Sequence, residues 1–298
     1  MKVCGLNSTN NFRTVQNHSC TYIIYVGFLE ILLSIVGITL NSTVLILFNS
    51  KACTLKKASY VLLVNQAVVD TYNCLLFMLP IGIINIQTNI QSKDMIILPE
   101  SPHSIFLNYI LVSAHLSFRT SIFTFLVNAI ERWLAVCRPL WHRGHVNTRN
   151  IKFAITIVWI FSLASSSTRI FIYNTKLGAI NSIVFILTII ISTILYVATY
   201  IKARKRVSTN HLSQRTICQD PINKLNSAKQ EKRLTLLFIL MYIPFLLAFL
   251  PMCFVVMFFW KYYPYCRDLF HILLLLSSIV NPILTLKFRR KVQKVCRE

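Results

Sequence analysis

Residues 234–259 read LTLLFILMYIPFLLAFLPMCFVVMFF and contain no charged side chain. A helix needs about 20 predominantly apolar residues to cross the hydrocarbon core of a bilayer, so this stretch is long enough to span a membrane. Other stretches of the chain have the same character. The predicted spans are residues 22–48, 58–87, 104–137, 151–173, 179–203, 231–259 and 266–287. The sequence therefore predicts an all-α membrane protein built around a bundle of seven transmembrane helices over residues 22–287.

Basic residues are distributed unevenly between the two sides of the predicted bundle. The connections after the first, third and fifth spans and the C-terminal tail, with the adjoining span ends, hold 23 of the 31 Lys and Arg residues. The N-terminal segment and the remaining connections hold 7. Because cytoplasmic connections retain positive charge, we expect a multi-pass protein of the plasma membrane with an extracellular N-terminus.

The formal net charge of +22 would favour nucleic-acid binding in a soluble protein. Here the basic residues adjoin predicted spans, where they would meet anionic lipid and cytoplasmic partners. We therefore expect membrane lipid, and no nucleic acid, among the partners.

Residues 1–21 are polar and lack the apolar core of a cleavable signal peptide, so we expect an extracellular N-terminal segment. Asn7 and Asn17 each begin a match to the N-glycosylation pattern, and an extracellular N-terminus would make both available. The cysteines near the predicted outer face are candidates for disulfide bonds: Cys4, Cys20, Cys253 and Cys266. Four cysteines allow three pairings, and the sequence does not choose among them.

Polar and proline residues stand at particular depths in the predicted spans. They include Gly37 and Asn41, Asp70, the Glu131-Arg132-Trp133 triplet, Trp159, Pro244, and Ser277-Ser278-Ile279-Val280-Asn281-Pro282. In this order and at these depths they resemble the signature residues of rhodopsin-like (class A) G-protein-coupled receptors, over about residues 22–296. The stretches Leu63–Asp70 and Glu131–His142 are most similar to divergent orphan or chemosensory-type members. The resemblance implies a non-enzymatic receptor that binds an extracellular ligand and activates heterotrimeric G proteins.

Asp70 marks an interior polar site independently of the resemblance. At 1.5 Å per residue it lies about 20 Å from the predicted inner flank at Lys57, near mid-membrane, where a charge is costly and faces the bundle interior. At about 100° per residue, Ser121 shares the face of its helix with Arg132. We therefore expect one polar cavity that gathers Asp70, Ser121, Ser277, Ser278 and Asn281. The resemblance implies an allosteric sodium ion there, which hard oxygen ligands would suit; the alternative is a water-filled hydrogen-bonded cluster.

Several other ionisable residues are candidates for ligand binding. Arg119 lies 13 residues before Arg132 and turns away from the polar face, toward the fourth and fifth spans. One alternative is that its guanidinium donates hydrogen bonds to hydroxyl groups on those spans. The other is that it faces the ligand pocket and binds an anionic or strongly polar group of the ligand. His115, His271 and Glu30 are further pocket candidates, or structural hydrogen-bonding residues. Ala114 stands where amine receptors of the family carry an Asp, so we do not expect a simple amine ligand. The second outer connection, about residues 174–178, is too short to form the family's usual hairpin lid over a peptide, so we expect a small polar or anionic ligand.

The resemblance assigns roles in G-protein coupling and activation to Glu131, Arg132, Leu140, Tyr196, Tyr242, Pro244 and Pro282. The chain departs from the family pattern at several of its marked positions. Tyr242 replaces a Trp, Thr285 replaces a Tyr, and Leu107 replaces the Cys of the usual disulfide, for which a Cys20–Cys266 or Cys253–Cys266 bond could substitute. Lys224 stands where many members carry an acid that pairs with the Arg of the third span. We therefore expect Glu131 to be the only nearby restraint on Arg132, and measurable constitutive G-protein activation that Lys224→Glu would reduce.

The C-terminal tail, residues 288–298, has helical periodicity. Phe288, Val292, Val295 and Cys296 recur at i, i+4, i+7 and i+8 with basic residues opposite, which predicts a short interfacial amphipathic helix. It resembles the eighth helix of the family. Cys296 is then a candidate for palmitoylation, or an inert thiol.

Two other functions compete with a signalling receptor. The departures at Tyr242 and Thr285 leave open a decoy receptor that binds ligand without signalling. A membrane transporter would normally show matched halves or helices broken by Gly and Pro around a central site, and the seven dissimilar spans do not fit that pattern.

Overall fold

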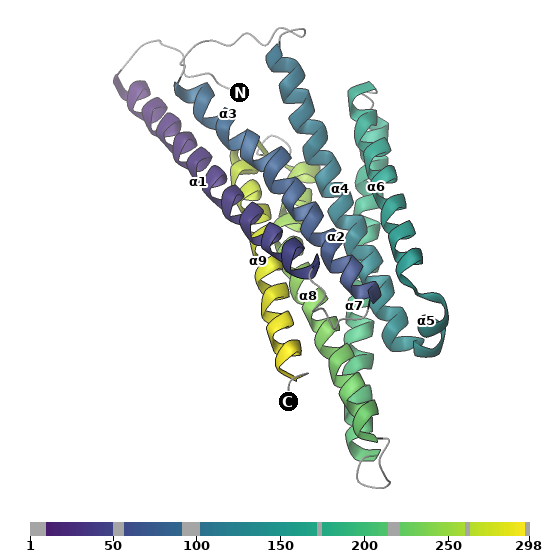
Figure 1. Cartoon of the computed structure of the whole chain (residues 1–298). Coiled ribbons are helices and arrows are strands. Elements are labelled where there is room, and N and C mark those ends of the chain that lie inside the picture. Colours follow the sequence, from purple (N-terminus) through teal and green to yellow (C-terminus); the bar gives the residue numbers. More distant parts are fainter. Residues whose placement is uncertain are drawn as a thin grey trace. The chain divides into compact units, whose positions relative to one another are not determined.

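The structure is a computed structural model that describes residues 10–49, 57–90, 102–171, 175–213, 221–259 and 263–295. Every regular element in these ranges is helical (Figure 1). The elements are α1 (Asn10–Asn49), α2 (Lys57–Asn73), η1 (Cys74–Met78), α3 (Leu79–Ile90), α4 (Pro102–Cys137), α5 (Pro139–His145), α6 (Thr148–Phe171), α7 (Thr175–Ser213), α8 (Pro221–Phe258) and α9 (Tyr263–Val295).

Seven segments within the described residues are long and apolar enough to cross a membrane. They are Tyr22–Phe48, Ala58–Gln87, Asn108–Cys137, Thr148–Ser167, Ile183–Ser208, Ala228–Val255 and Cys266–Phe288. Each overlaps one span predicted from the sequence, which confirms the seven-helix prediction. The second span is built from three consecutive elements, α2, η1 and α3.

The chain forms two compact units, which are described separately. The first unit comprises Met1–Ile46, Ala67–Ser117 and Pro244–Ile283. The second unit comprises Leu47–Gln66, Phe118–Ile243 and Leu284–Glu298. Several helices contribute one part to each unit.

In the first unit, α1 and α3 approach each other through two glycines. A Cβ atom placed on Gly27 would lie 2.8 Å from the carbonyl oxygen of Gly82, and one placed on Gly82 would lie 2.9 Å from the carbonyl oxygen of Gly27. Real Cβ atoms do not come this close to backbone oxygen atoms. Only glycine at both positions therefore permits this contact.

A proline accounts for the irregular middle of the second span. Pro80 has no N–H and cannot donate to the carbonyl four residues earlier, which belongs to Leu76. The chain widens there into the π-helical turn η1, in which the N–H of Leu79 donates to the carbonyl of Cys74. The hydroxyl of Ser113 on α4 donates to the Leu76 carbonyl at 2.8 Å. A side chain of a neighbouring helix thus donates to the carbonyl that has no helical donor because of the proline.

Hydrogen bonds within the second unit connect α2, α4 and α6. The indole N–H of Trp159 donates to the side-chain oxygen of Asn65 at 3.0 Å, and the amide nitrogen of Asn65 donates to Thr124 Oγ1 at 3.1 Å. Asn65 and Thr124 are buried. Since a polar group without a partner is costly away from water, these bonds fix the register of the three helices.

The end of the chain differs from the prediction. Within the described residues, α9 continues from the seventh span to Val295 without a break. The prediction of a separate short helix at residues 288–298 is therefore wrong for the part that the structure describes. No Gly or Pro occurs between Ile283 and Val295, and nothing interrupts the backbone hydrogen bonding. Cys296 lies outside the described residues. The connection after the third span, by contrast, contains a helix that was not predicted, α5.

Candidate functional site

Arg132 lies near the C-terminal end of α4 and is completely buried in the second unit. Its Nη1 donates to Oε2 of Glu231 on α8 at 3.0 Å, and its Nη2 donates to Oγ of Ser59 on α2 at 2.6 Å. The guanidinium also donates to both carboxylate oxygens of Glu131 and lies 5.6 Å from the centre of the Phe238 ring. A buried cation is tolerated when it is paired and hydrogen-bonded, and here two carboxylates and a hydroxyl meet that need. We call these residues, with His142, the Arg132 cluster.

The break between α4 and α5 brings His142 into this cluster. The residue before a proline avoids helical backbone angles, and Arg138, which precedes Pro139, has φ −130° and ψ 61°. The helix α4 therefore ends at Cys137, and Pro139 starts α5. One turn later, Nε2 of His142 lies 3.0 Å from Oε1 of Glu131. The same oxygen accepts a hydrogen bond from Arg132, so the imidazole and the guanidinium share it.

The Arg132–Glu231 ion pair overturns the expectation that Glu131 alone restrains Arg132. That expectation considered only Lys224, whose side chain lies outside the described residues. Glu231 follows Lys224 by seven residues, which is close to two turns of a helix, so both positions project from nearly the same face of α8. Glu231 is therefore an acid displaced along α8 from the position of Lys224, and it still contacts Arg132. The premise for measurable constitutive activity, that Glu131 alone restrains Arg132, is therefore wrong.

Tyr242 is held at both its ring and its hydroxyl in the second unit. The hydroxyl lies 3.1 Å from Thr193 Oγ1 and donates to the carbonyl of Ile189 at 3.1 Å, both on α7. Its ring packs on Phe125 and Tyr196, with centroid distances of 5.4 and 5.0 Å. The hydroxyl of Tyr196 donates to the carbonyl of Phe125 at 3.3 Å. Three of the helices of this unit, α4, α7 and α8, therefore meet at these rings.

The remaining positions assigned to activation have diverse surroundings. Thr285 is buried and its Oγ1 lies 3.9 Å from the sulfur of Met241. Leu140, on α5, is 84% exposed. Pro244 and Pro282 lie inside α8 and α9.

Asp70 is the centre of a buried polar chain in the first unit. Its Oδ2 accepts a hydrogen bond from Nδ2 of Asn281 at 2.8 Å, and its Oδ1 accepts one from Oγ of Ser278 at 3.3 Å. The amide of Asn73 donates to Ser278 Oγ at 3.3 Å, and Ser117 donates to Asn73 Oδ1 at 2.9 Å. The structure thus brings together three of the residues that the sequence grouped.

The other two members of that group are placed differently. Ser277 is buried on α9 and Ser121 is buried in the second unit. Asn73 and Ser117 were not predicted as part of this site. Their spacing was a usable signal, since Asn73 follows Asp70 by three residues and shares its helix face.

Glu30 and His271, two of the ligand-binding candidates, are in contact in the first unit. Nδ1 of His271 on α9 lies 3.2 Å from Oε1 of Glu30 on α1, and Nδ2 of Asn85 on α3 donates to the other carboxylate oxygen at 2.8 Å. The Phe77 ring meets the imidazole edge-on at 5.3 Å. Glu30 is fully buried and His271 and Asn85 nearly so. Asn85 was not predicted, because a single Asn in an apolar span carries no distinctive pattern.

Arg119 and His115 are not part of that contact. Arg119 is buried in the second unit, and its guanidinium carbon lies 5.1 Å from the centre of the Phe185 ring on α7. It therefore points toward the fifth span, the direction derived from its helical angle. His115 is half-buried on α4 in the first unit.

Cysteine pairing differs from the alternatives raised by the sequence. Cys253 and Cys266 are free thiols, so neither the Cys253–Cys266 nor the Cys20–Cys266 bond is formed in the structure. Cys4 and the glycosylation candidate Asn7 lie outside the described residues, and the side chains of Cys20 and Asn17 are not described.

Comparisons with known proteins agree with this architecture. Residues 40–181 match the family model of the 7 transmembrane receptor (rhodopsin family). The fold is similar to the crystal structure of squid rhodopsin, with a TM-score of 0.73, 19% sequence identity, and coverage of 92% of this chain and 85% of that chain. At that identity the likeness concerns the fold alone. No curated protein matches the chain at a significant level.

Proposed function

We propose that this chain, a rhodopsin-like seven-transmembrane receptor by its family match and its fold, binds an extracellular ligand and activates heterotrimeric G proteins. The observation that carries the proposal is the Arg132 cluster. Arg132 joins α4 to α8 through Glu231. Opening that pair would free the guanidinium for a G protein, and the exposed Leu140 on α5 would supply an apolar contact for the same partner.

A ligand drives such a change only through its differential affinity for the open and closed states. A ligand contact of modest energy is enough to change the populations of the two states, because the equilibrium between them shifts about tenfold for each 1.4 kcal/mol. Glu131 and His142 would hold Arg132 in place while Glu231 separates from it. No step in this mechanism requires a catalytic group.

For the ligand we propose a small polar or anionic molecule. The Glu30–His271–Asn85 contact supports a polar subsite, since it gathers one carboxylate, one imidazole and one amide from three helices. Arg119 is a second candidate contact for an anionic group, and His115 a third. Placement of the chain among orphan or chemosensory-type members stays a prediction.

We also propose that the N-terminus is extracellular and that the protein resides in the plasma membrane. The excess of basic residues on one side of the spans supports this orientation. An epitope tag at residue 1 should be stained on unpermeabilised cells, and a glycosidase should lower the apparent mass through Asn7 and Asn17. Staining only after permeabilisation would reverse the orientation.

A sodium ion near Asp70 is a further part of the proposal. The donor set fits such an ion, because the Asp70 carboxylate and the Ser278 hydroxyl offer the hard oxygen ligands that such cations take. Bound Na⁺ would supply positive charge next to a carboxylate that is 4% exposed. Asn281 would orient that carboxylate through its hydrogen bond.

The test of the function is G-protein recruitment in cells that express the chain and are exposed to a library of small polar and anionic compounds. We expect at least one compound to recruit a G protein to the wild type and to fail with Arg132→Ala at matched surface expression. A compound that binds without recruiting any G protein would instead support a decoy receptor. The specific observation behind that second candidate is Tyr242, whose hydroxyl is bound by two partners on α7 where family members carry an indole.

A further inference from the structure

The described acidic side chains of the second unit are buried, whereas several of its basic side chains are exposed. The described acids are Glu30, Asp70, Glu131, Glu231 and Asp268, and each of them is buried. The second unit holds two of these, Glu131 and Glu231, and both contact Arg132. Within the described residues, therefore, no acidic side chain reaches the surface of this unit.

Basic side chains, by contrast, are exposed along three helices of the same unit. We define the basic surface as Arg143 on α5, Arg149 and Lys152 on α6, and Arg204, Lys205 and Arg206 on α7, all exposed. The sequence contains no Asp or Glu between Glu131 and Asp220. Arg149 and Lys152 are three residues apart on α6 and face the same way.

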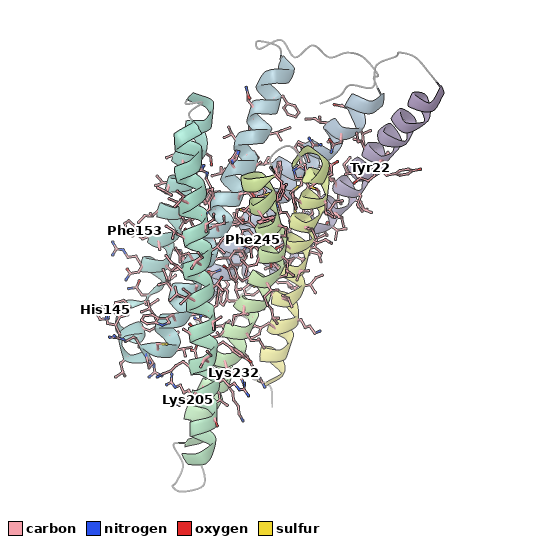
Figure 2. The ribbon with its side chains drawn as sticks, turned by 180° about the vertical axis from the view of Figure 1, so that it is seen from behind. Tyr22, His145, Phe153, Lys205, Lys232 and Phe245 are labelled. Atoms are coloured by element: carbon pink, nitrogen blue, oxygen red, sulfur yellow. The ribbon has the colours of Figure 1, made fainter. Side chains whose placement is uncertain are left out.

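These residues stand at the ends of membrane-spanning segments. The span in α6 begins at Thr148 and the span in α7 ends at Ser208. Arg149 and Lys152 therefore lie at the start of their span, and the α7 cations lie in the last turn of theirs. Large apolar side chains adjoin them: Phe153 is 67% exposed and Trp141 is 47% exposed. Figure 2 shows Phe153 and His145 on the part of the unit formed by α6 and α5, and Lys205 toward the lower end of α7. Basic and aromatic side chains in adjacent positions are typical of the level of lipid headgroups.

We infer that the basic surface binds the headgroups of anionic phospholipids, with a preference for phosphoinositides. Arg and Lys side chains near a membrane attract anionic lipids, and Arg groups bind phosphate through paired N–H donors. Three cations within one helix-turn-helix, Arg143, Arg149 and Lys152, suit a headgroup that carries several phosphates. A lipid is favoured over a soluble phosphate because Phe153 and Trp141 offer apolar contacts to acyl chains beside the cations. The inference does not depend on G-protein activation.

The test is lipid binding by the purified full chain in phosphatidylcholine micelles, titrated with fluorescent phosphatidylinositol bisphosphate. The variant is Arg143→Gln/Arg149→Gln/Lys152→Gln. The matched control is Lys2→Gln/Arg13→Gln/Lys93→Gln, which removes the same charge from segments assigned to the opposite face. We expect the first variant to bind the lipid about tenfold more weakly or worse, and the control to bind as the wild type does.

Further measurements distinguish a phosphoinositide from other anionic lipids and from a soluble phosphate. Phosphatidylserine should bind more weakly than the phosphoinositide, and soluble inositol phosphate should compete poorly because it has no acyl chains. The charge-retaining variant Arg143→Lys/Arg149→Lys keeps the proposal testable if the triple variant does not fold. It removes the paired N–H donors of Arg, so it should bind the phosphoinositide more weakly than the wild type does. Equal losses in both triple variants would show a general effect of net charge and overturn the inference. Unchanged binding in the first triple variant, or soluble inositol phosphate binding as tightly as the lipid, would overturn it as well.

Discussion

The guanidinium of Arg132 and the carboxylate of Glu231 lie 3.0 Å apart, and their side chains are 0% and 10% exposed. The pair joins α4 to α8 where water has little access, so it gains more from electrostatic attraction than a surface pair would. Glu131 cannot substitute for Glu231, because it belongs to the same helix as Arg132 and its other contact, His142, lies on α5 and not on α8. The Arg132–Glu231 pair therefore opposes separation of α4 and α8.

Glu231→Gln should raise ligand-independent activity. A hydrogen bond between charged groups contributes about 1.5–3 kcal/mol, and each 1.4 kcal/mol shifts a conformational equilibrium about tenfold. We expect basal nucleotide exchange on the coupled G protein to rise about tenfold or more at matched surface expression. Gln230→Glu/Glu231→Gln is the control: it moves the carboxylate by one residue, about 100° around the helix, and should not restore the low basal level. Equal basal exchange in wild type and Glu231→Gln would contradict a restraining role.

Sodium should raise the melting temperature of the solubilised protein relative to choline at equal chloride concentration. Asp70→Asn should abolish the difference between the two salts, because it removes the charged ligand and keeps the shape of the side chain. Asp268→Asn is the matched control, since Asp268 is also a buried acid of the first unit but pairs with Arg267. A sodium effect that survives Asp70→Asn would place the ion elsewhere.

Loss of either partner in the Glu30–His271 contact should destabilise the protein. A buried polar group that loses its partner costs about 1–3 kcal/mol, so we expect Glu30→Gln and His271→Phe each to lower the melting temperature. The double variant should cost less than the sum of the two, because each single change already removes the shared contact. Additive effects in this cycle would mean that the two residues act independently.

Gly27→Ala should destabilise the chain while Gly144→Ala should not. A Cβ at position 27 would lie 2.8 Å from the carbonyl oxygen of Gly82, whereas one at position 144 meets nothing within 4 Å. Overpacking of this kind costs about 1–3 kcal/mol. Thermal melting of both variants in the same detergent tests the contact. Equal melting temperatures for Gly27→Ala and wild type would show that α1 and α3 can separate without cost.

The spans were predictable because membrane crossing depends on local composition, which the sequence displays directly. Asp70, Ser278 and Asn281 were also predictable as one group, since each is a polar residue that the bilayer forces toward the interior. The pairing of Arg132 with Glu231 was not. It depends on which turn of α8 faces α4, and a displacement of seven residues preserves the face while moving the acid along the helix.

Two other features depend on structure beyond the local pattern. The π-helical turn η1 arises because Pro80 leaves the Leu76 carbonyl without its helical donor, and the acceptor is satisfied by Ser113 from a different helix. The tail was misjudged for the opposite reason. Its periodicity indicated a helix correctly, but periodicity does not reveal whether a helix is separate from the one before it.

Hydrogen bonds from α1 to α9 also have a consequence for how the chain is assembled during synthesis. Asn41 on α1 donates to the carbonyl of Ser278, and Glu30 on α1 meets His271, so both polar residues of the earlier helix find partners on the later one. A nascent chain whose translation has stopped before residue 263 holds Glu30 and Asn41 without those partners. Until then Glu30 has Asn85 on α3 and Asn41 has the Gly37 carbonyl within its own helix. Since each further hydrogen bond made in hydrocarbon is favourable, α1 should reach its final packing only after α9 has been inserted.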